Sequence, residues 1–115
     1  MANICQNTFY FECEENYNEW VNKFQEFLEQ FDGEVTWGTD YTDDDHPYNG
    51  EGAFEGEFES NWTFPWEDFQ KLLTEDIPES DHVYFRCLSE EYGNRYVAMN
   101  IFSTNHWWDE QTFLL

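Results

Sequence analysis

The stretch ICQNTFYFECEENYNEWVNKFQEFLEQFDG, residues 4–33, decides the fold, because its apolar spacing changes midway. Residues 4–13 are rich in aromatic side chains with a period of two, which predicts a central strand with one face formed by Cys5, Phe9, Phe11 and Cys13. From Asn16 the spacing becomes helical; Asn16 and Glu19 predict a capping box and Gly33 a C-terminal stop. The apolar stripe of this predicted helix consists of Trp20, Phe24, Phe27, Leu28 and Phe31.

The rest of the chain continues with further strands and a second helix. Strands are expected at 34–38, 53–62, 82–88 and 96–103, and the last two form a hairpin about 89–95. Residues 40–52 have loop composition. A helix begins near Pro65 and presents inward Trp66, Phe69, Leu72 and Leu73.

A chain of 115 residues fits one domain, residues 1–115, since half that length would bury too little apolar surface. Two amphipathic helices must bury their stripes against a sheet. The element order therefore predicts an α+β fold, a ferredoxin-like two-layer sandwich with an antiparallel sheet and two helices on one face.

Charge and aromatic content set the class of partner. The chain has 26 Asp+Glu against 4 Lys+Arg, a net charge of -22, which disfavours direct binding to nucleic acid or to an anionic membrane. Its 12 Phe, 7 Tyr and 6 Trp predict a folded protein rather than an acidic disordered tail. The net charge predicts a basic partner or none. Three cysteines, no leader and no apolar span predict buried free thiols and a soluble cytoplasmic protein.

Short motifs resemble those of the YubB/Api92-like family, whose members have a ferredoxin-like domain. They are Asn3, Cys5 and Asn7 at the start, and Phe58, Ser60, Trp62, Thr63 and Pro65 before the second helix. The resemblance implies a ferredoxin-like fold and a gene carried by phages or plasmids. It implies no activity, because no catalytic residues are established for that family.

No group of residues predicts catalysis or a cofactor. The histidines, His46, His82 and His106, have no partners at the spacing of a metal site or a catalytic triad. The acidic run 40–45 leaves a weak cation site open, but it lacks the EF-hand pattern. We therefore expect a protein that is not an enzyme and has no metal or cofactor.

Acidic residues are concentrated between positions 40 and 59, where no base interrupts them. On a strand, Glu55, Glu57 and Glu59 would lie roughly 6.6 Å apart on one face, close to the phosphate repeat of a nucleic acid strand. A hydrated outer strand face is the simpler alternative. The predicted partner-binding acids are Asp40, Asp43, Asp44, Asp45, Glu51, Glu55, Glu57 and Glu59.

Trp107 and Trp108, beside Asp109 and Glu110, form a second candidate contact. Packing of this pair over the sheet's edge or open face is the alternative.

These patterns lead to a hypothesis of phosphate mimicry. The protein would be a non-enzymatic inhibitor from a mobile element that blocks a basic nucleic-acid-binding host protein, such as a restriction or CRISPR effector. The alternative is a small acidic protein-protein interaction domain with an aromatic binding surface and no mimicry. Both hypotheses allow a homodimer.

Overall fold

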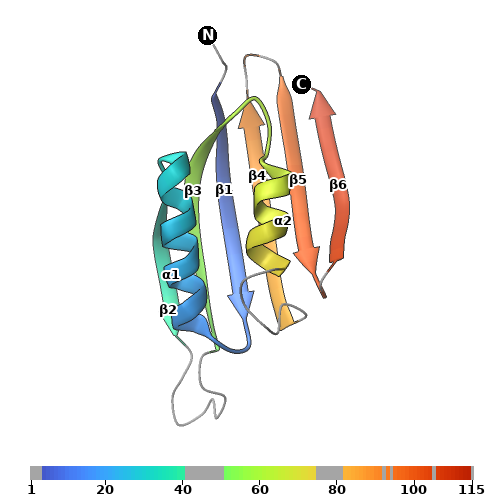
Figure 1. Cartoon of the computed structure of the whole chain (residues 1–115). Coiled ribbons are helices and arrows are strands. Elements are labelled where there is room, and N and C mark those ends of the chain that lie inside the picture. The colour runs from blue at the N-terminus through green and yellow to red at the C-terminus, as the bar shows by residue number, and fades with distance from the viewer. Residues whose placement is uncertain are drawn as a thin grey trace.

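The chain folds into two layers, a sheet and a pair of helices on one of its faces (Figure 1). The computed structural model describes residues 4–40, 51–74, 82–91, 93, 95–104 and 106–114, without the side chains of Asp40 and 108–114. All strand pairs are antiparallel, in the order β2-β3-β1-β4-β5-β6. The predicted α+β class, antiparallel sheet and two helices are therefore confirmed.

Six strands make up the sheet, one more than the sequence predicted. Their bounds are β1 Ile4–Cys13, β2 Glu34–Asp40, β3 Gly52–Asn61, β4 Val83–Glu91, β5 Tyr96–Ser103 and β6 His106–Leu114. β6 was missed because HWWDEQTFL does not alternate and its pairing with β5 shifts register between Met99 and Ile101. β4 also extends three residues into the predicted turn, to Glu91.

β1 lies inside the sheet, as its sequence predicts, between β3 and β4. Phe9 pairs with Gly56 on one side and with Cys87 on the other. A Cβ at position 56 would come within 2.5 Å of the Phe9 ring and of the Glu34 carbonyl oxygen. Glycine at this position therefore lets the Phe9 ring lie against the β3 backbone.

Helix α1, Tyr17–Leu28, forms as predicted, but its ends differ from the predicted caps. Asn16 adopts a left-handed conformation, φ 64°, and makes no side-chain capping bond, so the predicted capping box is wrong. A 3₁₀ turn, η1 Glu29–Phe31, continues the helix, and the left-handed residue that ends it is Asp32 rather than Gly33. Gly33 serves a close approach instead, because a Cβ there would lie 2.5 Å from Phe58 Cβ.

Helix α2, Trp66–Thr74, buries Phe69, Leu72 and Leu73. The predicted inward position of Trp66 is wrong, because its side chain is 40% exposed at the first turn. Among the described residues, neither helix is long and apolar enough to cross a bilayer.

The core lies between the helices and the sheet and is dominated by phenylalanine. Phe9, for example, packs against Phe24 with ring centroids 5.3 Å apart, and Phe69 against Phe85 at 5.0 Å. The fully buried aromatic side chains are Trp20, Phe9, Phe11, Phe24, Phe54, Phe58, Phe69, Phe85 and Phe102. These side chains point toward α1 and α2, and no helix of the described residues lies on the opposite face of the sheet, which is called the open face below (Figure 1).

Candidate protein-binding surface on the open sheet face

The predicted row of glutamates forms on the open face of the sheet. Along β3, Phe54, Gly56, Phe58 and Ser60 are buried on the helix side, so the alternate residues point the other way. Glu55 and Glu57 are exposed and Glu59 is half-buried. Gln6 on β1 donates a hydrogen bond of 3.2 Å to Glu59 Oε1. The three glutamates therefore lie in a row on the open face of β3, a strand in the interior of the sheet.

Neighbouring strands add carboxylates to the same face. Glu34 of β2 pairs directly with Glu57, an arrangement in which two like charges repel each other. Across β1, Gln6 pairs with both Glu59 and Glu90, which places Glu90 on this face as well. Glu34, Glu55, Glu57 and Glu59 are called the acidic patch below.

Charge density in the acidic patch reaches that of DNA. The molecule exposes 7105 Å², which spread over 26 acids averages about 270 Å² each. Same-face positions in a sheet are roughly 6.6 Å apart along a strand and about 4.8 Å between strands, so each covers roughly 32 Å². The four carboxylates and the neighbouring same-face positions of Trp37, Gln6, Thr8 and Tyr10 make eight such positions, which gives roughly 65 Å² per charge, against roughly 110 Å² for a DNA cylinder.

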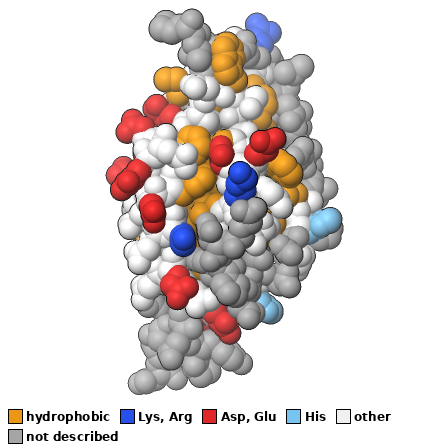
Figure 2. Space-filling model, in the orientation of Figure 1, with side chains coloured by type: hydrophobic (Ala, Val, Ile, Leu, Met, Phe, Trp, Pro, Cys, Tyr) orange, Lys and Arg blue, Asp and Glu red, His pale blue; other side chains and the backbone are white. Residues whose placement is uncertain are grey.

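Bases are few and lie outside the acidic patch. Lys23 and Lys71 line a shallow depression between the two helices, and Figure 2 shows basic side chains toward the middle of that face, with acids along its left edge. Arg95 lies in the β4–β5 turn. Arg86 of β4 is the one Lys or Arg of the described chain on the open face, with its guanidinium carbon 4.5 Å from the Tyr10 ring centroid and 5.8 Å from that of Tyr84.

Beyond Arg86 the open face becomes apolar. Leu88 of β4 pairs with Met99 of β5, and Arg86 pairs with Ile101. These three apolar side chains are half-buried although no helix covers them. A depression of about 310 Å³ joins the two halves of the face and is lined by Thr8, Phe9, Tyr10, Glu55, Arg86, Leu88 and Met99. Acidic and apolar halves thus adjoin on one surface.

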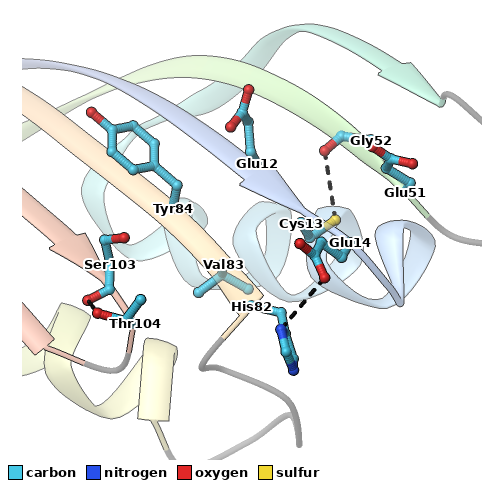
Figure 3. Close-up of a pocket in the computed structure, with 10 residues that line it drawn as sticks. All are labelled: Glu12, Cys13, Glu14, Glu51, Gly52, His82, Val83, Tyr84, Ser103 and Thr104. Atoms are coloured by element: carbon cyan, nitrogen blue, oxygen red, sulfur yellow. Dashed lines mark hydrogen bonds and ion pairs between the residues drawn. The ribbon is translucent and has the colours of Figure 1, made fainter.

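A second acidic depression, of about 430 Å³, lies at the end of the sheet (Figure 3). Glu12, Glu14 and Glu51 line it, and His82 Nδ1 lies 3.4 Å from Glu14 Oε2. Figure 3 shows this pair beside the end of β1, with Tyr84 and Ser103 on the far side of the depression. Within the described ranges, no three His, Cys, Asp or Glu side chains are grouped as a metal ion would require.

The thiols are poor candidates for a nucleophile. Cys5, Cys13 and Cys87 are free and buried, as the sequence predicts. Burial raises the pKa of the Cys87 thiol far above its usual range, and burial also raises the pKa of Cys5 despite its hydrogen bond with Ser60. A thiol that resists ionisation does not attack an electrophile at neutral pH.

The structure places the described members of the predicted site in three separate locations. Glu55, Glu57 and Glu59 lie together in the acidic patch, and Glu51 lies apart from them at the end depression. Trp107 packs inward against Phe102 and Phe85, with centroid distances of 5.2 and 6.3 Å, and its indole nitrogen donates to Gln70. The positions outside the described side chains are Asp40, Asp43, Asp44, Asp45 and Trp108.

Sequence reasoning missed Glu34 and Arg86 as members of the open face. The phase of each strand gives the side on which these residues lie, and the alternation of buried Phe85 and Cys87 could have placed Arg86 opposite the core. Their neighbours depend on register, which the sequence pattern does not supply.

Comparisons with protein-family models, with curated proteins and with solved structures find no match. The resemblance to the YubB/Api92-like family therefore stays a prediction.

Proposed function

We propose that this protein is a non-enzymatic inhibitor that mimics the DNA phosphate backbone and blocks a basic nucleic-acid-binding protein of a bacterial host. A restriction or CRISPR effector is the target class that this mechanism fits. The observation that carries the proposal is the acidic patch, in which Glu34, Glu55, Glu57 and Glu59 reach a DNA-like charge density with no base among them.

The mechanism would be occupancy of the target's nucleic acid channel. Proteins that bind DNA take most of their nonspecific affinity from Lys and Arg contacts to phosphates, and carboxylates at similar spacing offer those side chains the same charge. A net charge of -22 would also speed the encounter with a positive channel. The sheet fixes the backbone positions of the carboxylates, so the spacing between them is set before a partner binds.

The apolar half of the open face favours a second candidate, an acidic protein-protein interaction domain without mimicry. Leu88, Met99 and Ile101 would then supply the affinity and the carboxylates only solubility. Salt distinguishes the two candidates, since charge-led binding weakens when the screening length falls to about 3 Å near 1 M and apolar binding persists.

The finer fold assignment and the origin of the protein are part of the proposal. The succession β1, α1, β2, β3, α2, β4 supports a ferredoxin-like unit, to which β5 and β6 would be added beyond β4. An inhibitor of defence nucleases would be encoded by a phage or plasmid and would act in the cytoplasm of the host cell.

The test is affinity capture of a host partner with elution by duplex DNA. A captured nucleic-acid-binding protein that is released by both DNA and high salt supports mimicry. The variant Glu55→Gln, Glu57→Gln, Glu59→Gln should capture none, whereas the control Glu19→Gln, Glu26→Gln, Glu29→Gln, which removes equal charge from the helix layer, should capture as the parent does. Equal capture by both variants would remove the acidic patch from the interface.

A further inference from the structure

One cross-strand row of the open face joins an exposed tryptophan to a carboxylate. Trp37 of β2 pairs with Glu55 of β3, and Glu55 pairs with Tyr10 of β1. Direct partners in an antiparallel pair point to the same side, with Cβ atoms roughly 4.5–5.5 Å apart. The Trp37 side chain is 49% exposed and Glu55 is exposed, so indole and carboxylate are presented to solvent side by side.

The next residue along this row, Tyr10, already binds a guanidinium, that of Arg86. Tyr10 pairs with Arg86 of β4, whose guanidinium carbon lies 4.5 Å from the Tyr10 ring centroid. The Tyr10 hydroxyl donates a hydrogen bond of 2.6 Å to Glu12 Oε1. The face therefore already combines carboxylates, aromatic rings and one bound guanidinium, and on the β2 side of Glu55 the indole of Trp37 is left exposed.

We propose that Trp37 and Glu55 form a subsite for an arginine side chain of the partner, so that the open face recognises an arginine-rich protein segment. The incoming guanidinium would lie on the indole and hydrogen-bond the Glu55 carboxylate. The inference rests on the proposed function and deepens it, since it names the chemistry of the basic partner. The partner's other cations would meet the rest of the acidic patch.

Arginine, rather than lysine, suits this pair of groups. A guanidinium is planar and weakly hydrated, stacks on aromatic faces and forms two parallel hydrogen bonds to a carboxylate. A lysine ammonium is a compact, strongly hydrated charge that gains less from an exposed ring. Stacking of a guanidinium on an exposed indole is worth about 0.5 to 1 kcal/mol, which corresponds to a preference of at most about two- to fivefold for arginine.

The test compares two synthetic probes of equal charge, nonaarginine and nonalysine, by titration calorimetry at about 0.15 M ionic strength. The parent protein should bind nonaarginine about two- to fivefold more tightly. Trp37→Ala should bring the two affinities together while changing nonalysine binding by less than about twofold. Trp37→Phe, which keeps an aromatic face, should retain most of the preference. Trp62→Ala is the matched control, because Trp62 is 47% exposed but lies in the turn after β3.

Three results overturn the inference. Equal affinity of the parent for the two probes, an equal loss for both probes in Trp37→Ala, or the same loss of preference in Trp62→Ala would each remove the arginine subsite. If both probes bind equally and both are lost in Glu55→Gln, Glu57→Gln, Glu59→Gln, the acidic patch still binds cations and the proposed function stands without the subsite. Absence of binding to either probe would overturn both proposals.

Discussion

Replacing Glu55, Glu57 and Glu59 together by Gln should stabilise the fold, although it should abolish binding. Glu57 pairs directly with Glu34 on the adjacent strand β2, and Glu55 and Glu59 place further negative charges on both sides of it along β3. Unit charges at about 5 to 7 Å repel by roughly 0.6 to 0.8 kcal/mol each in a water-like dielectric. Three close pairs therefore give about 2 kcal/mol of stabilisation at low ionic strength, falling below about 0.5 kcal/mol near 1 M salt.

Urea denaturation followed by tryptophan fluorescence measures this effect, because urea adds no ions. The midpoint of the triple variant should exceed that of the parent at low salt, and the two should converge near 1 M NaCl. Glu19→Gln, Glu26→Gln, Glu29→Gln is the control, in which helical spacing places Glu19 and Glu26 within reach of Lys23, so this variant should gain no stability. A triple variant that is no more stable than the parent at low salt, or that keeps its gain at high salt, would exclude charge repulsion as the cause.

Three further predictions concern the buried layer. Asn7 is 1% exposed, donates hydrogen bonds to Phe58 O and Ser60 Oγ, and accepts a hydrogen bond of 2.6 Å from Ser89 Oγ. Asn7→Ala should therefore lower the free energy of unfolding in urea by about 3 to 5 kcal/mol. The double variant with Ser89→Ala should lose about 1 to 2 kcal/mol less than the sum of the two single variants. Gly56→Ala should cost about 1 to 3 kcal/mol because its Cβ would meet the Phe9 ring, and a melting temperature equal to the parent's would contradict this. Because the pKa of the Cys87 thiol is raised in the folded protein, only the unfolded chain ionises this thiol just above the ordinary pKa of 9.0. The free energy of unfolding should therefore fall as the pH rises beyond 9.0, by up to about 1.4 kcal/mol per pH unit. In urea titrations at several pH values, Cys87→Ala should flatten that slope.

The strongest periodicities in the sequence predicted most of the structure. Alternation placed β1 and β3 and told their two faces apart, and helical spacing placed α1. Asn7 was not among the predicted inward residues, but it shares the phase of Cys5 and Phe9 and is buried with them, held by hydrogen bonds.

What the sequence did not predict depends on contacts between distant segments. β6 has no alternation of its own and is defined by its pairing with β5. The contact of Glu34 with Glu57 depends on strand register, as does the row from Trp37 to Arg86. The predicted cap at Asn16 failed because the turn out of β1 places this residue in a left-handed conformation that local sequence did not reveal.

The two faces of β3 explain how a chain with this net charge can fold, and they favour the proposal that its glutamates serve binding rather than folding. Phe54 and Phe58 are buried on one side, within an aromatic core that supplies the hydrophobic stabilisation. The glutamates on the other side lie outside this core and are expected to repel one another, so the core does not depend on them. Solubility alone would be served by acids interspersed with lysines. An uninterrupted carboxylate row whose repulsion is expected to lower stability supports the proposal of a cationic partner, whose binding would relieve that repulsion.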